Sequence, residues 1–212
     1  MGVILKNYID EHTILGIWEI EEGYHELLRR VHLDAEDTER LNGFKNDKRK
    51  IEWLSVRALM NHIIGKESKI VYNAARKPFV VSHPYNISIS HSNRLTSVLV
   101  SKSKRVGIDL EYMSHRIKDL AFKFVNDEEH ITDDHEKEKF HLYVHWCAKE
   151  ALYKICDKQD INFRENLTLT PFTLKDRGQV EGRVTNIHGT EHFLLHYFRI
   201  DEYAVVWERA HV

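Results

Sequence analysis

The chain has 212 residues, enough for one large domain or two small ones with hydrophobic cores. Its 31 Lys and Arg residues nearly balance its 33 Asp and Glu residues, and a net charge of −2 argues against a dedicated nucleic-acid-binding protein. No apolar run approaches the roughly 18 residues of a membrane span, and the N-terminus lacks a signal-peptide pattern. We therefore expect a soluble cytoplasmic protein that binds neither nucleic acid nor membrane.

The first half of the chain mixes helices with short strands. Residues 14–20 have the alternation of a strand, and a short helix is expected over residues 24–31. Asp34 is placed to cap a second helix. The clearest helix runs over residues 48–64, with an apolar stripe on one side and Gly65 as its stop. Basic residues gather on its polar side and just before it: Lys45, Lys48, Arg49, Lys50 and Arg57.

A hairpin is expected later in this half. Residues 87–90 alternate cleanly, residues 91–94 read as a turn, and residues 96–101 run back as a strand. His91 and Ser92 in the turn have side chains that can donate to a phosphate. Ser and Asn also favour turns for their own sake, so the pattern alone leaves both interpretations open.

An acidic strand follows at residues 105–111, with Gly107, Asp109 and Glu111 on one face. Two carboxylates this close repel each other, which favours a divalent metal between them or one shared proton. Oxygen ligands suit Mg²⁺ better than Zn²⁺. The alternative is an exposed edge strand with two solvated acids.

The second half continues with helices and ends in strands. Helices are expected over residues 117–124, 127–135 and 136–156, and strands over residues 172–174, 179–185, 192–199 and 203–207. The long helix carries Glu150 and Lys154 at i and i+4, either as a surface ion pair or as part of a metal site. His141 and His145 have the spacing of a zinc-binding face, but no third ligand is evident, so we expect both to be solvated.

Two segments together resemble a known signature. Residues 107–111, Gly-Ile-Asp-Leu-Glu, are followed by Trp-Cys-Ala-Lys-Glu-Ala-Leu-Tyr-Lys at residues 146–154. This pair, in this order, resembles the surfactin-type (Sfp-type) 4'-phosphopantetheinyl transferases, and the resemblance covers roughly residues 35–160. It implies an α+β pseudodimer of two similar subdomains, each a small antiparallel sheet with a long helix packed on it. We place the subdomains at residues 1–104 and 105–212, with coenzyme A in the cleft between them, and expect a monomer.

The resemblance also implies an activity. Members transfer 4'-phosphopantetheine from coenzyme A to a serine of an acyl carrier protein, or of a peptidyl or polyketide carrier domain, and release adenosine 3',5'-bisphosphate. This is the holo-[acyl-carrier-protein] synthase reaction of fatty acid and secondary metabolite biosynthesis. Asp109, Glu111 and Glu150 match the ligands of Mg²⁺, for which Mn²⁺ is a substitute. Glu150 is either a ligand or the base that takes the serine proton, and Lys154 matches a lysine beside the pyrophosphate.

The nucleotide contacts implied by the resemblance lie in the N-terminal subdomain. Ser90-His91-Ser92 matches a tip whose histidine contacts the 3'-phosphate of coenzyme A, and Lys77-Pro78 matches a segment along the nucleotide. Lys48 and Arg49 fall near a basic helix start that binds the same phosphate. The segment before the tip departs from the commoner Asn-Ile-Ser-His-Ser arrangement, so Asn86 is not equated with the family's asparagine.

Three other functions compete with this one. The chain would be an inactive homologue that only docks carrier proteins, another Mg²⁺-dependent phosphoryl or nucleotidyl transferase, or a histidine-based metal protein. For the transferase, the partner is a small acidic protein, and we expect residues 115–130, with Phe122 and Phe124, to dock the carrier helix.

Overall fold

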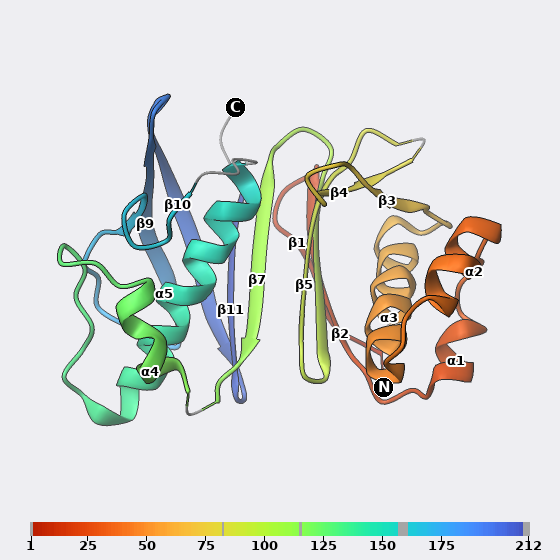
Figure 1. Ribbon diagram of the computed structural model, residues 1–212, viewed down its shortest axis with the longest axis horizontal. Coiled ribbons are helices and arrows are strands. Elements are labelled where there is room, and N and C mark those ends of the chain that lie inside the picture. Colours follow the sequence, from red (N-terminus) through yellow and green to blue (C-terminus); the bar gives the residue numbers. More distant parts are fainter. Residues whose placement is uncertain (1, 82, 115, 157–160, 210–212) are drawn as a thin grey trace. The chain divides into compact units, whose positions relative to one another are not determined.

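The computed structural model describes residues 2–81, 83–114, 116–156 and 161–209 and is an α+β protein (Figure 1). The chain divides into two compact units, Met1–Ser103 and Lys104–Val212, each with its own antiparallel sheet and hydrophobic core. The α+β class expected from the sequence is confirmed. Among the described helices, none is both long and apolar enough to cross a membrane.

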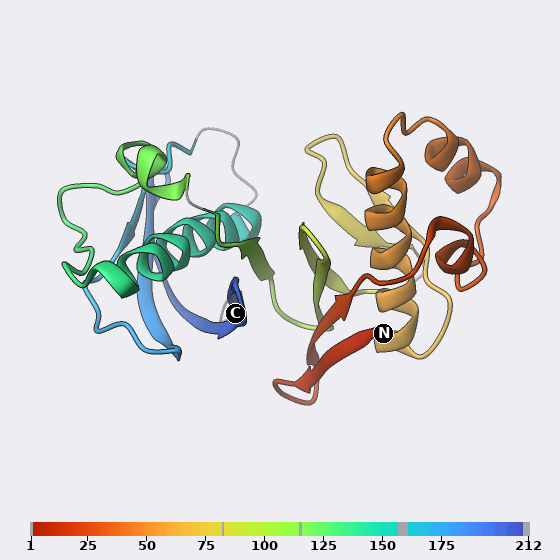
Figure 2. The ribbon, with the colours of Figure 1, turned by 90° about the horizontal axis from the view of Figure 1, so that it is seen from below.

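The N-terminal unit has a six-stranded sheet in the order β1-β2-β6-β5-β4-β3. Its helix α3 packs on β2 and β6, and the small helices lie on the far side of α3 from the sheet (Figures 1 and 2). The strands are β1 (Val3–Tyr8), β2 (Thr13–Glu19), β3 (Ile70–Tyr72), β4 (Pro78–Val80), β5 (Asn86–Ser92) and β6 (Leu95–Ser101). The helices are α1 (Tyr24–Leu28), α2 (Ala35–Asn42) and α3 (Asp47–Ile64).

Single residues define two helix ends in this unit. The Asp34 side chain accepts a hydrogen bond from the Asp37 backbone N–H at 2.8 Å, and so caps α2 as expected. Gly65 ends α3 in the left-handed conformation, with φ of 74°, which a residue without Cβ adopts at little cost.

The hairpin turn is shorter than the sequence suggested. His91 pairs with Thr96 and Ser92 pairs with Leu95, so both residues lie in β5, and the expected turn over residues 91–94 was wrong in extent. Only Asn93 and Arg94 connect the strands. Asn93 takes φ of 51°, and a residue that tolerates positive φ permits this tight two-residue connection. His91 therefore projects from a strand of fixed register.

The C-terminal unit has a five-stranded sheet in the order β7-β11-β10-β9-β8, with α5 lying against β7 and β11 (Figure 1). The strands are β7 (Val106–Tyr112), β8 (Leu167–Leu169), β9 (Arg177–Asn186), β10 (Gly189–Ile200) and β11 (Tyr203–Arg209). The helices are α4 (Ile117–Leu120), the 3₁₀ turn η1 (Ala121–Lys123) and α5 (His135–Cys156).

Two expected elements of this unit are absent. Residues 127–134 are not helical, and residues 172–174 do not form a strand. In the first segment, Glu129 accepts hydrogen bonds from the backbone N–H groups of Asn126 and Leu169, both at 2.8 Å. A side chain that bonds to distant backbone in this way offers the segment an alternative to helix.

Phe124 also differs from its expected role. It is fully buried, and its ring lies 5.4 Å from that of Trp146, so it belongs to the core and not to a docking surface. Phe122, two residues earlier, is 64% exposed and stays available to a partner.

A buried ion pair ties this loop to α5. The Lys149 ammonium lies 2.8 Å from the Glu129 carboxylate, and both side chains are 0% exposed. The ammonium also donates to the backbone carbonyls of Phe124 and Phe163. Its positive charge is thus matched by one carboxylate and two carbonyl oxygens, which offset the cost of burying it.

We expect Lys149→Met to lower the free energy of unfolding by about 3–5 kcal/mol, because it leaves the Glu129 carboxylate buried without its counter-charge. Urea denaturation measures this change. The matched control is Lys137→Met on the same helix: Lys137 is exposed and pairs with Asp134 at 2.8 Å, and because solvent screens this pair its loss should have little effect on stability. Equal effects of the two substitutions would contradict the prediction.

Candidate active site

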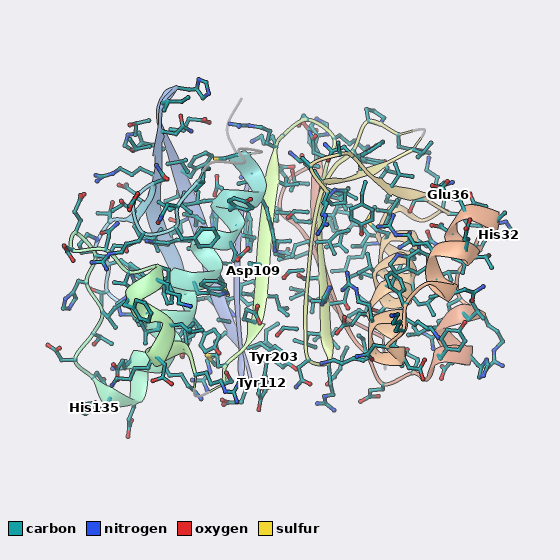
Figure 3. All side chains as sticks on the ribbon, in the orientation of Figure 1. His32, Glu36, Asp109, Tyr112, His135 and Tyr203 are labelled. Carbon is teal, nitrogen blue, oxygen red and sulfur yellow. The ribbon has the colours of Figure 1, made fainter. Side chains whose placement is uncertain are left out.

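The acidic strand β7 lies directly beneath α5. A Cβ atom placed on Gly107 would collide with the Ala151 carbonyl and the Ile155 side chain. Gly107, Asp109 and Glu111 alternate onto one face of the strand, so this face is the one turned toward the helix. The missing side chain at Gly107 lets α5 approach β7 closely, and Lys154 of the helix thereby reaches Asp109, which is labelled in Figure 3.

Lys154 of α5 joins the helix to the strand. Its ammonium donates to Asp109 Oδ1 at 2.7 Å and to the Ile108 carbonyl at 2.9 Å. The Asp109 side chain is almost completely buried, whereas that of Lys154 is partly exposed. A carboxylate and an ammonium in these surroundings form a charge-assisted hydrogen bond.

Glu150 shares the negative potential of this site. Its burial, and then the negative charge of Asp109, raise the pKa of its carboxyl to about 7, with Glu111 adding to the rise and Lys154 opposing it. Burial, with Asp109 and Glu111 adding to it, raises the pKa of the nearby Cys147 thiol, so at neutral pH this sulfur is protonated and is not a thiolate ligand. The carboxylates of Asp109, Glu111 and Glu150 therefore repel one another at this site.

The chemistry of these donors fits a hard divalent cation. Carboxylate oxygens are the protein ligands preferred by Mg²⁺, and a bound cation would relieve the repulsion that raises the pKa of Glu150. Within the described ranges, no three His, Cys, Asp or Glu side chains are already grouped as a metal cage. At Asp109, the positive charge is supplied by Lys154.

A second polar cluster lies in the N-terminal unit, where α3 begins. Arg49 Nη1 donates to Nε2 of His91, which lies in β5, and Lys48 lies next to Arg49 in the first turn of the helix. Glu52 contacts all three: its carboxylate oxygens lie 3.3 Å from Arg49 Nη1, 3.5 Å from His91 Nδ1 and 4.0 Å from Lys48 Nζ. Glu52 was not among the residues predicted from the sequence, although its i+3 and i+4 spacing from the two cations indicates such contacts.

The other expected nucleotide residues lie elsewhere on this sheet. Pro78 begins β4 opposite Tyr72, and β4 meets β5 at Phe79 and Asn86, at the end of β5 away from His91. The Lys77 backbone N–H donates to Asn73 Oδ1 at 2.9 Å. The two serines flank His91 in β5: Ser90 is buried and its carbonyl accepts from Ser97 Oγ, and Ser92 is half-buried beside the turn.

His141 and His145 are core residues, and the expected solvated face was wrong. Both are buried, and their rings pack on Phe172 at centroid distances of 4.7 and 5.5 Å. The Thr132 backbone N–H donates to His141 Nδ1 at 3.1 Å. Burial lowers the pKa of each imidazole to about 4. The distant segment that carries Phe172 covers this side of α5, so helical spacing alone did not reveal the burial.

Comparison with known proteins matches the half of the chain that carries the carboxylates. The family model described as the 4'-phosphopantetheinyl transferase superfamily matches residues 105–207. The chain is 30% identical over 112 residues to the 4'-phosphopantetheinyl transferase AcpT of Escherichia coli K12, a match that covers 50% of this chain and 57% of the relative. AcpT of Escherichia coli O157:H7 matches with the same identity and coverage.

We expect Gly107→Ala to lower the free energy of unfolding by about 1–3 kcal/mol, because the added methyl group forces β7 and the α5 backbone apart. Chemical denaturation measures the change. Gly23→Ala is the control, since a Cβ at Gly23 has no atom within 4 Å and its φ of −76° suits alanine. A Gly107→Ala protein as stable as the control would refute the close approach.

The two buried histidines predict a loss of stability in acid. Unfolded imidazoles take up protons near pH 6.5, but the folded ones do not until about pH 4. The full stability is therefore present above pH 6.5 and decreases as the pH falls toward 4, by up to about 3 kcal/mol per histidine. Urea denaturation between pH 7 and 4 should show a smaller decrease for His145→Phe than for the wild type. The exposed His188, changed to Gln, should leave the decrease as it is.

Proposed function

Because residues 105–207 belong to the 4'-phosphopantetheinyl transferase superfamily, we propose that this protein transfers 4'-phosphopantetheine from coenzyme A to a serine of a carrier protein. The match spans 57% of the length of the curated relatives. The observation that carries the proposal lies within the matched residues: Asp109, Glu111, Glu150 and Lys154 converge where α5 lies on β7.

Glu150 is the proposed general base. A carboxyl with a pKa of about 7 accepts a proton far more readily at neutral pH than an ordinary glutamate does. The serine Oγ forms a bond to the phosphorus that carries pantetheine, while the bridging P–O bond breaks and adenosine 3',5'-bisphosphate leaves. The serine proton passes to Glu150, directly or through a water. Lys154, already held by Asp109, neutralises charge on the transferring phosphate.

Asp109, Glu111 and Glu150 are the residues that would hold Mg²⁺ or Mn²⁺. The ion would supply positive charge to the pyrophosphate and to the leaving phosphate. Its charge would also lower the pKa of Glu150, so the use of Glu150 as a ligand and its use as a base compete with each other.

The N-terminal unit is the proposed holder of the nucleotide. Lys48, Arg49 and His91 form a cluster of donors, which is the chemistry that a phosphate needs, and we assign it to the 3'-phosphate of coenzyme A. Lys77 and Pro78 are proposed to lie along the nucleotide, and Ser90 and Ser92 to support the strand that carries His91.

The proposed partner is an acyl carrier protein or a peptidyl or polyketide carrier domain. We propose that the protein acts on it as a monomer in the cytoplasm. The exposed Phe122 of η1 offers an apolar contact, and the Lys123 ammonium lies 5.7 Å from the centroid of its ring. An apolar side chain with a cation beside it complements an acidic helix. Phe124 takes no part, because it is buried.

Intact-mass spectrometry of an apo acyl carrier protein, incubated with this protein, coenzyme A and Mg²⁺, tests the function. The carrier should gain one phosphopantetheine group, and EDTA should abolish the gain. Lys154→Met and Asp109→Asn should each slow it by about 10²–10³-fold. The first removes the positive charge beside the transferring phosphate, and the second removes a carboxylate that holds Lys154 and would hold the metal ion. Lys137→Met, a change of the same kind at the exposed start of α5, should keep the wild-type rate.

Two negative results separate the competing functions. Coenzyme A binding without any mass gain, over several carrier proteins, would favour an inactive docking homologue. An absence of both binding and mass gain would favour a transferase of another substrate class.

A further inference from the structure

Glu52 lies among the cations of the N-terminal cluster. Side chains of a helix lean toward its N-terminus, so a residue three or four positions after Arg49 and Lys48 reaches back to both. Its carboxylate also crosses to β5, where it lies 3.5 Å from His91 Nδ1. The Glu52 side chain is 12% exposed, whereas those of Arg49 and Lys48 are 46% and 61% exposed. The carboxylate is therefore the best-shielded group of the cluster.

The directions of the hydrogen bonds agree with this arrangement. A guanidinium only donates, so His91 Nε2 must accept from Arg49, and the ring proton of a neutral imidazole is then on Nδ1, facing Glu52. Each of the three groups that contact the carboxylate thus presents positive charge or an N–H to it. Helical spacing alone would give an ordinary surface pair with Arg49 or Lys48, but it does not account for the contact with His91.

We propose that Glu52 is a built-in counter-ion that competes with a phosphate for Lys48, Arg49 and His91. The inference rests on the proposed function, in which this phosphate is the 3'-phosphate of coenzyme A. Glu52 holds the donors in place before the nucleotide binds, and it lowers the affinity of the cluster for the released adenosine 3',5'-bisphosphate. It is a residue that sets affinity and takes no part in the reaction itself.

The size of the effect follows from charge. With His91 neutral, Lys48 and Arg49 contribute +2 and Glu52 contributes −1, so the cluster carries +1. Glu52→Gln keeps the shape of the side chain and raises the cluster to +2. A dianionic phosphate that contacts Arg49 lies within a few ångströms of this change, and one interaction of that kind alters a dissociation constant by about tenfold.

Isothermal titration of two nucleotides tests the proposal on the full chain. Adenosine 3',5'-bisphosphate should bind Glu52→Gln about tenfold more tightly than it binds the wild type. Adenosine 5'-monophosphate, which lacks the 3'-phosphate, should change by less than about twofold. Glu39→Gln removes an exposed carboxylate from α2 and should match the wild type with both nucleotides. Circular dichroism checks folding, and Glu52→Ala provides a second variant if Glu52→Gln is not folded.

Unchanged or weaker binding of the bisphosphate by Glu52→Gln would overturn the proposal, and so would an equal gain for both nucleotides. The mass-spectrometric transfer assay keeps the two proposals apart. Transfer by the wild type, without tighter binding by the variant, would overturn the role of Glu52 and leave the function standing. Tighter binding by the variant, without transfer by the wild type, would support the counter-ion and contradict the function.

Discussion

The close approach of α5 to β7 at Gly107 is the contact on which the acidic site depends. A glycine removes the side chain that would hold the helix off the strand. Once the helix lies this close, Lys154 reaches Asp109, and Glu150 is buried within the repulsion of two other carboxylates. The raised pKa of Glu150 is therefore a consequence of the close backbone packing at Ala151, the next residue of the same helix.

The two polar clusters are built in the same way, with the signs of their charges reversed. In the C-terminal unit, Lys154 is an ammonium among carboxylates. In the N-terminal unit, Glu52 is a carboxylate among cations. A cluster of like charges repels itself, and one opposite charge held on the same helix lowers that cost while no ligand is bound. In the N-terminal unit this partner, Glu52, competes with the proposed phosphate, so it moderates affinity as well as stability.

Contacts on the other side of α5 hold the helix in place despite the repulsion between the carboxylates of the site. Lys149 precedes Glu150 and turns to the other side of the helix, where Glu129 and two backbone carbonyls receive it. The loop that carries Glu129 is thereby fastened to the helix, and Phe124 packs beneath it. Adjacent residues of one motif thus serve different purposes, because successive helix positions point about 100° apart.

The sequence by itself determined the elements whose signals are local: the periodicity of α3 and α5, the cap at Asp34, the alternation of β7 and the spacing of its two acids. The tertiary structure decided whatever depends on a partner far along the chain. Helical spacing did not show that Phe172 covers His141, or that Glu129 bonds to Leu169 and keeps its own segment out of a helix. The contact of Glu52 with His91 likewise exists only because α3 and β5 belong to one folded unit, and no periodicity within one segment carries that information.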